Sequence, residues 1–414
     1  MKRSLFVLFF GLLILVDGAR GEFRAGISVR NVTPDPLLPV SGGVGPSKPT
    51  VKKEGELQVR ALVFEDGLTQ VAFVSADFLG FPATLGNRVR AKVKGILPKN
   101  ILIGATHTHS APDCYGFPDG KGGTAADPKY HTRVCDLMAE AINEAVAKLQ
   151  PAALKIQSGE AKGKIAFNYY AEQLYDPRCH IVQAVDASGR PFATLVNYAI
   201  HPEVIGSNRG IISPDLVGPL YDRIAEKGGG TGIFMNSAQG GMVTADNRGP
   251  DGKDIGTWTE CQRIGHLLAD EALRIVEKAK VQQNPKLFCD AFTLALPVDS
   301  PLMRQLLASL SGGNANVPVS METQINLVNL GNAQIITIPG EALPNIGFYL
   351  KRKMKGEHNL LFGLTNDAFG YILTKEDWQS FKRYDYITRT SLGEMTGEIY
   401  TQAVLRFVEK SPRP

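Results

Sequence analysis

The chain of 414 residues has no CxxC pair, no internal repeat, no low-complexity linker and only one long apolar run. Its five cysteines are odd in number and irregularly spaced, so they define no disulfide framework, and a thiolate zinc site is not expected. No basic run stands out and the net charge is only +4, so nucleic-acid binding is not predicted. What remains is an ordinary globular composition, 43% hydrophobic and 21% charged.

The one apolar run lies close to the N-terminus. A basic start at residues 1–3 precedes twelve mostly apolar residues, 5–16, and small residues at Ala19 and Gly21 suit a cleavage site. A run this short is a poor membrane span. We therefore predict a signal peptide over residues 1–21 and a secreted or periplasmic mature protein with no integral membrane span. An uncleaved anchor is the alternative.

Apolar strand-like runs alternate with helix-like runs along the rest of the chain. The expected strands include residues 57–64, 70–77, 101–105, 192–200, 231–237 and 333–339, and the expected helices cover 130–149, 261–280 and 393–410. This pattern predicts an α/β (mixed α+β) fold whose strand ends carry the active-site loops. Residues 22–414 are expected to form one catalytic domain, because the weak boundary signal at 280–288 does not justify a division.

Histidines follow two of the expected strands directly. His107 and His109 come after residues 101–105, on the same side of an extended chain, and His201 ends another apolar run. Imidazoles delivered by separate strands suit a zinc ion whose ligands come from distant parts of the chain. Buried or rim histidines without a metal are the alternative.

A carboxylate is the natural partner for two imidazoles at a catalytic zinc. Residues 335–344, "IITIPGEALP", end an apolar strand and present Glu341 in the same manner. The alternative is a glutamate that simply begins a helix, where the helix dipole favours a negative charge.

Four segments in this order, "ATHTHSAP", "NYAIHP", "PGEALP" and "GLTNDAFGYILTKEDW", resemble the neutral, non-lysosomal ceramidases. Those enzymes are zinc-dependent amidases that cleave the N-acyl bond of ceramide. The resemblance runs from about Ala25 to about Tyr400, and the C-terminal β-sandwich domain of that family is not expected in this chain.

The resemblance implies one zinc ion per chain on His107, His201, Glu341 and Tyr371. It also places His109 beside the bound water and the scissile carbonyl, where the imidazole could move the proton toward the leaving amine. The implied mechanism is hydrolysis by zinc-activated water, because zinc lowers the pKa of bound water to about 7.

Two segments depart from the ceramidase pattern. Where that family carries Gly-Asp-Val-Ser-Pro-Asn, residues 236–248 read "NSAQGGMVTADNR", so Val243, or Thr244 after a slip of one residue, replaces the family serine. The substrate-contacting Asn-Arg-Ser becomes "NYY" at residues 168–170. We therefore expect related chemistry on a different molecule.

These two segments, with their surroundings, supply the remaining candidate residues. Thr244 is a candidate nucleophile, in competition with the zinc-activated water. The expected substrate contacts are Asn168, Tyr169, Gln239 and Asp246. Asp246 is also, with Asp215, a candidate to orient a ligand histidine.

Three hypotheses follow. The chain is an exported zinc amidase acting on an N-acyl compound such as a sphingolipid, or a zinc enzyme of the same architecture acting on a glycan or an ester, or a binding protein on a former enzyme scaffold. The pocket discriminates between the first two, because a ceramide needs a long apolar trench whereas a sugar needs polar groups and stacking aromatics. The sequence predicts no oligomeric state.

Overall fold

The structure is a computed structural model that describes residues 21–310 and 318–414. All of the predicted signal peptide except Gly21 lies outside these residues. Within the two ranges, none of the helices combines the length and the apolar character needed to cross a membrane.

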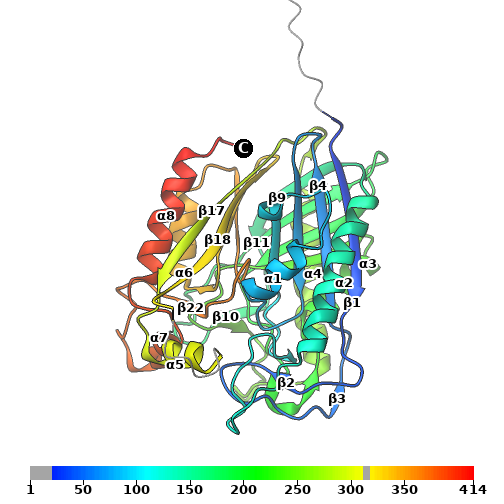
Figure 1. Cartoon of the computed structure of the whole chain (residues 1–414). Helices are drawn as coiled ribbons and strands as arrows, with labels where there is room; N and C mark the ends of the chain where they lie inside the picture. Colours follow the sequence, from blue (N-terminus) through cyan, green and yellow to red (C-terminus); the bar gives the residue numbers. More distant parts are fainter. Residues whose placement is uncertain (1–20, 311–317) are drawn as a thin grey trace, which may run out of the picture.

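Three β-sheets form the body of the protein (Figure 1). The first has the order β6-β5-β4-β1-β8, the second β14-β12-β11-β9-β16 and the third β17-β18-β19-β21. The strands of the first sheet are β1 (Arg24–Asn31), β4 (Gln58–Glu65), β5 (Gln70–Ala76), β6 (Ile101–Ala105) and β8 (Gln150–Pro151). Those of the second are β9 (Ala153–Glu160), β11 (Arg178–Val185), β12 (Pro191–Tyr198), β14 (Thr231–Asn236) and β16 (Val281–Gln282). The third contains β17 (Leu287–Pro297), β18 (Ser320–Leu330), β19 (Ala333–Thr337) and β21 (His358–Phe362).

Inward-facing side chains of all three sheets meet in one hydrophobic core. Phe73 of β5, Leu195 of β12 and Phe362 of β21 belong to this core and are fully buried, and the rings of Phe73 and Phe362 pack edge to face at 5.2 Å. The sheets are therefore fixed against one another, and loops at their ends are held in a defined relative position.

Helices cover the outer face of each sheet. In Figure 1, α2 lies over β1 and β4, and α8 lies against β17. The first sheet carries α1 (Ala83–Arg90) and α2 (Pro128–Ala147), the second α3 (Val217–Glu226) and α4 (Trp258–Glu277), and the third α6 (Pro344–Lys353) and α8 (Thr396–Lys410). The shorter α5 (Pro301–Leu310) and α7 (Asp385–Arg389) lie together near one end of the molecule.

The two long predicted helices begin at capping residues. Asp127 accepts hydrogen bonds from the backbone N–H groups of Lys129 and Tyr130, and Pro128 occupies the first turn of α2. Thr257 caps α4 by accepting from the backbone N–H of Glu260. The predicted mixed α/β fold is confirmed, and each expected helix and strand named above overlaps one of these elements.

Short two-stranded pairs gather segments at the strand ends of the large sheets. They are β2 (Val40–Ser41) with β7 (Ala111–Pro112), β3 (Lys52–Lys53) with β13 (Ile211–Ile212), β10 (Ala166–Asn168) with β15 (Val243–Ala245), and β20 (Glu341–Ala342) with β22 (Tyr371–Ile372). All five cysteines are free thiols.

Candidate metal centre

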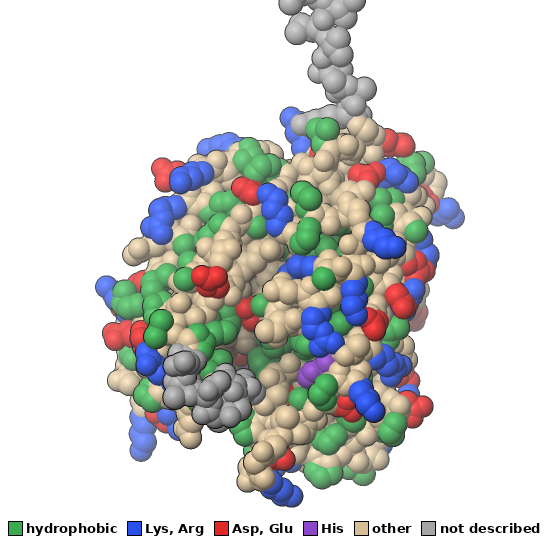
Figure 2. Space-filling view, in the orientation of Figure 1, with side chains coloured by type: hydrophobic (Ala, Val, Ile, Leu, Met, Phe, Trp, Pro, Cys, Tyr) green, Lys and Arg blue, Asp and Glu red, His purple; other side chains and the backbone are tan. Residues whose placement is uncertain are grey.

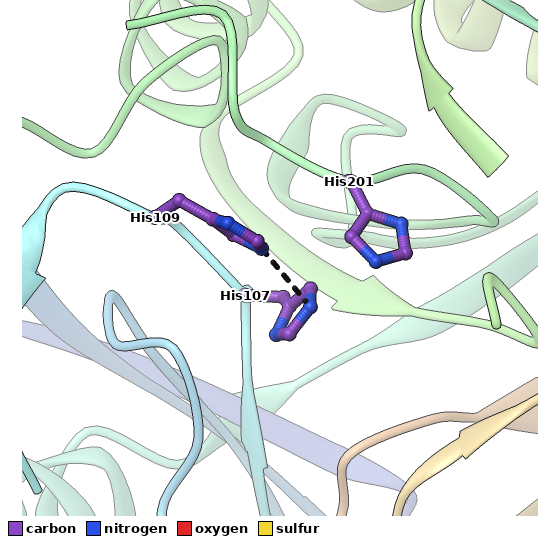
Figure 3. Close-up of side chains that lie close together, drawn as sticks. All are labelled: His107, His109 and His201. Atoms are coloured by element: carbon purple, nitrogen blue, oxygen red, sulfur yellow. Dashed lines mark hydrogen bonds between the residues drawn. The ribbon is translucent and has the colours of Figure 1, made fainter. Parts of the chain in front are cut away.

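The histidines predicted at strand ends converge (Figure 3). His107 and His109 lie on the segment after β6, and His201 lies on the segment after β12. Nitrogen atoms of the three rings all lie within 4.8 Å of one another. Glu341, the first residue of β20, joins them, because its Oε2 lies 3.4 Å from His107 Nε2 and 3.1 Å from His201 Nε2.

Backbone carbonyls fix which nitrogen carries the proton in two of these rings. His107 Nδ1 lies 2.6 Å from the Leu79 carbonyl oxygen, and His201 Nδ1 lies 2.9 Å from that of Val243. A carbonyl only accepts hydrogen bonds, so both Nδ1 atoms must donate. In neutral rings the Nε2 lone pairs then face the Glu341 carboxylate, and three electron-rich atoms converge.

Such a convergence favours a cation. The pKa shifts in the site have the directions that a preference for positive charge predicts. Burial opposes charging of His201, but the hydrogen bond that the charged ring donates to Glu341 and the charges of Glu203 and Glu341 outweigh it and raise the pKa of this imidazole. Burial likewise opposes ionisation of Glu341, yet His107 and His201 lower the pKa of its carboxyl far below the usual range.

The donor set fits zinc. Two imidazoles and a carboxylate are common ligands of catalytic zinc ions, and a metal–nitrogen distance of about 2 Å in a tetrahedron places neighbouring ligand atoms about 3.3 Å apart. The contacts that Glu341 makes, 3.4 and 3.1 Å, match this spacing. His107, His201 and Glu341 could therefore hold a zinc ion with little rearrangement.

His109 points its Nε2 at the same centre, 3.2 Å from His107 Nε2. Burial, together with the neighbouring histidines and against the opposing charge of Glu203, lowers the pKa of His109 to about 3. The His109 ring is thus neutral near pH 7. Its other nitrogen, Nδ1, lies 3.5 Å from Glu203 Oε2.

One side chain outside the histidines, that of Asn236, holds both histidine loops in place. The Asn236 side chain, at the end of β14, donates from Nδ2 to the carbonyl oxygens of Thr106 (3.0 Å) and Ile200 (2.7 Å). These carbonyls belong to the residues directly before His107 and His201. His107 itself has a φ of 74°, a left-handed conformation that is uncommon outside glycine and is often found at functional sites.

Tyr371 lies beside the cluster. β20 and β22 are parallel, and their register pairs Glu341 with Tyr371. The phenol is buried and its hydroxyl donates to Met242 Sδ at 3.1 Å. Burial, followed by the negative charge of Glu341, raises the pKa of Tyr371 well above its usual value.

Thr244 is also close to the cluster. It forms a parallel bridge with His201, and its hydroxyl interacts with the Glu203 carboxylate and lowers the pKa of that group. Glu203 and Asn236 are the residues that the sequence reasoning missed. The position of Glu203 two residues after His201 was the available signal; nothing in the sequence distinguished Asn236.

The other candidates lie elsewhere. The Asn168 side chain accepts from the backbone N–H groups of Tyr170 and Ala171 and so stabilises a turn, Tyr169 is 69% exposed, and Asp246 is paired with Arg248. Gln239 is fully buried, and its amide has no partner among the described residues. Within the described part of the chain these four do not line the cavity at the cluster, and their assignment to substrate binding stays a prediction.

Asp215 does not orient a histidine through any hydrogen bond found among the described residues. Its carboxylate accepts from the backbone N–H groups of Ile205 and Leu216. Burial, against these hydrogen bonds, raises its pKa to about 6. Asp215 therefore stabilises the loop that follows His201.

A cavity of about 880 Å³ opens onto the cluster, and His107, His109, Glu341 and Tyr371 form part of its wall. The remaining wall is largely apolar and includes Leu79, Leu85, Phe117, Met303, Leu306, Met321, Phe369 and Leu392. The space-filling view shows a hollow at the end of the molecule where α5 lies, with hydrophobic side chains and a histidine around it (Figure 2). The site thus combines side chains able to bind a metal with a largely apolar wall.

Several known proteins are similar to this chain in sequence or in structure. No protein-family model matches the chain. Neutral ceramidase A of Dictyostelium discoideum is 28% identical over 179 residues, which are 37% of this chain and 25% of that protein. The neutral ceramidase of Pseudomonas aeruginosa is 26% identical over 246 residues, 52% of this chain and 36% of that protein. The matched segments therefore span well under half of these curated relatives.

Solved structures match over nearly the whole chain. A crystal structure of the Pseudomonas aeruginosa neutral ceramidase has a TM-score of 0.75 at 18% identity, covering 95% of this chain and 75% of that one. A ceramidase complexed with C2 has a TM-score of 0.73 at 17% identity, covering 95% and 76%. This chain has the fold of the neutral ceramidases. The resemblance predicted from the four sequence motifs is confirmed.

Proposed function

We propose that this chain is a zinc-dependent hydrolase that cleaves the amide bond of an N-acylated lipid. The observation that carries the proposal is the convergence of His107, His201 and Glu341 beside a largely apolar cavity of about 880 Å³, whose wall includes His107 and Glu341. A long acyl or alkyl chain suits the apolar wall, and its amide would then lie against the polar end. The similarity to neutral ceramidases supports the same bond type.

In this proposal His107, His201 and Glu341 hold the metal, and Tyr371 is the fourth ligand that the ceramidase resemblance implies. Zinc, when bound, supplies a Lewis acid and lowers the pKa of water in its coordination sphere. His109 points its Nε2 at the centre, where the imidazole would transfer a proton toward the leaving amine. The Leu79 and Val243 carbonyls keep the two ligand histidines in the tautomer that binds metal.

Another substrate class is the second candidate. The two segments that depart from the ceramidase pattern, residues 168–170 and 236–248, support it, because the first replaces the substrate-contacting positions of that family and the second replaces its serine segment. The same zinc site would then act on an N-acylated sugar or an ester.

Turnover of a substrate panel tests the proposal. Purified protein is stripped of metal, reloaded with zinc, and supplied with ceramides of different acyl length, N-acylated sugars and simple esters. We expect zinc-dependent release of fatty acid from the long-chain amides and little from the sugars. Zinc-dependent turnover confined to the sugars or esters would support the second candidate, and no zinc-dependent turnover at all would contradict both.

A further inference from the structure

Of the three histidine tautomers in the cluster, that of His109 is not fixed by a backbone carbonyl of any described residue. His107 and His201 each donate from Nδ1 to a main-chain oxygen. His109 Nδ1 faces instead the carboxylate of Glu203 at 3.5 Å. If the proton of His109 were on Nε2, it would point at His107 Nε2, 3.2 Å away, and would occupy the centre where the lone pairs converge.

We propose that Glu203 is a positioning residue that keeps the proton of His109 on Nδ1 and leaves the Nε2 lone pair facing the metal centre. A carboxylate acts on an imidazole in this way at many metal sites, where it fixes the tautomer and the orientation of the ring. The inference deepens the proposed function, since it concerns the same centre.

The surroundings of Glu203 support this role. The Thr244 hydroxyl interacts with the carboxylate, and the backbone N–H of Glu203 donates to the His201 carbonyl oxygen at 3.0 Å. The backbone N–H of His109 donates to the Pro202 carbonyl oxygen at 3.1 Å. The segments that carry His109 and Glu203 are thus joined directly, next to the two side chains.

The charge of Glu203 is consistent with the same role. Its carboxylate lies 3.5 Å from His109 Nδ1, a nitrogen that carries a proton when Nε2 keeps its lone pair. A carboxylate that stays ionised can only accept hydrogen bonds, so it faces the N–H side of the His109 ring.

This arrangement gives Thr244 a function other than nucleophile. Its hydroxyl is directed to Glu203, and through Glu203 it supports His109. Thr244, Glu203 and His109 then form a chain of contacts that ends at the metal centre. Glu203 lies only two residues after His201, and Pro202 between them restricts the backbone. This short segment holds the Glu203 carboxylate next to His109.

Two variants of Glu203 distinguish a role in positioning the His109 proton from a role in packing alone. In Glu203→Gln the amide oxygen still accepts a hydrogen bond from Nδ1–H, whereas Glu203→Leu has a similar volume and no acceptor. Nitrogen-15 NMR of histidine-labelled, zinc-loaded protein reports the tautomer of His109, assigned by comparison with His109→Gln. Zinc affinity is measured by competition with a chelating dye.

We expect the parent and Glu203→Gln to carry the His109 proton on Nδ1. Glu203→Leu should lose this tautomer and bind zinc more weakly, because a His109 proton on Nε2 would then point at His107 Nε2 in the centre where zinc binds. Thr244→Val should weaken zinc binding less than tenfold, and Thr244→Ser should restore it.

Thr108→Val is the matched control. It also replaces a buried threonine hydroxyl by a methyl group beside the cluster, but that hydroxyl donates to the Ser213 carbonyl oxygen. It should lower thermal stability and leave both the His109 tautomer and the zinc affinity unchanged. A His109 proton found on Nε2 in the parent, or a Glu203→Leu variant with parental tautomer and zinc affinity, would overturn the inference. Neither readout needs a substrate, so failure of the proposed amidase activity would be recognised separately.

Discussion

Single side chains at the centre have distinct tasks because their hydrogen bonds differ. His107 and His201 are held in one tautomer by main-chain carbonyls, and Glu341 lies between their Nε2 atoms. At this scale the predictions concern which side chain holds metal and which one reacts.

His107→Ala and His201→Ala should each lose most of the bound zinc. Each change removes one of three converging donors and leaves a carboxylate that is buried without its partner. Elemental analysis of protein purified without added metal is the measurement, with one zinc ion per chain expected in the parent. His131→Gln is the control, because His131 lines the same cavity but contacts the Asp113 carbonyl oxygen; loss of zinc in this control would argue against a specific site.

Tyr371→Phe should weaken zinc binding less than either histidine change. The variant keeps the aromatic packing and removes only the hydroxyl, while His107, His201 and Glu341 still hold the ion. Zinc affinity and turnover are measured together. If both stay at the parental values, the hydroxyl interacts only with Met242 and Tyr371 is not a ligand.

Thr244→Ala should keep turnover within tenfold of the parent, at full zinc occupancy. Hydrolysis by water needs no covalent bond to the Thr244 oxygen, and that hydroxyl is directed to Glu203. A nucleophilic Thr244 would instead make the same change abolish turnover without loss of zinc. A decrease of more than a thousandfold in a zinc-loaded variant would identify Thr244 as the nucleophile.

At the scale of elements, the loop between β14 and β15 packs directly on β20 and fixes the position of Glu341. The backbone N–H of Gly240 donates to the Ala342 carbonyl oxygen at 2.9 Å. A Cβ atom on Gly240 would lie only 2.1 Å from the Glu341 carbonyl oxygen. Glycine is therefore required here by the close approach of two backbones.

Gly240→Ala should displace Glu341 and weaken zinc binding at least tenfold. Overpacking of this kind also costs about 1–3 kcal/mol of stability, so the melting temperature should fall. Gly43→Ala is the control, since Gly43 lines the cavity and an added Cβ there meets nothing closer than 4.0 Å. Parental zinc affinity in Gly240→Ala would show that the loop does not position Glu341.

The strand ends that carry His107, His201 and Glu341 were predictable from the sequence, because apolar runs followed by polar residues mark the places where sheets present side chains. Glu203 and Asn236 were not. Their roles depend on which segments lie next to each other, and Asn236 reaches Thr106 across 130 positions of sequence. The apolar wall of the cavity was equally hidden, since its residues come from many separate segments.

For the whole molecule, the arrangement of three sheets around one core explains how such distant segments meet. The core includes residues of all three sheets, and the site occupies their strand ends.

A polar network also links the second and third sheets. Lys351 of α6 lies 2.9 Å from both Asp176 Oδ2 and His180 Nε2, and Ser158 Oγ contacts His180 Nδ1 and His358 Nδ1.

This network predicts that the folded state loses stability in mild acid. Burial, then the charge of Lys351, lowers the pKa of His180 well below its usual value, and burial lowers that of His358. Below about pH 6.5 the unfolded chain takes up protons that these folded histidines do not bind. The contribution of these histidines to stability is therefore fully present above pH 6.5 and decreases as the pH falls toward their folded pKa values, by up to about 1.4 kcal/mol per pH unit for each histidine.

His180→Gln should make this dependence shallower. Removal of one titrating group reduces the slope of unfolding free energy against pH by up to about 1.4 kcal/mol per unit between pH 6.5 and 5. Urea unfolding at several pH values in this window gives the slope. Ser158→Ala is the control, because it removes a hydrogen-bond partner of His180 and no titrating group, and should lower stability equally at each pH. A parental slope in His180→Gln would mean that this imidazole binds its proton equally well in the folded and unfolded chains.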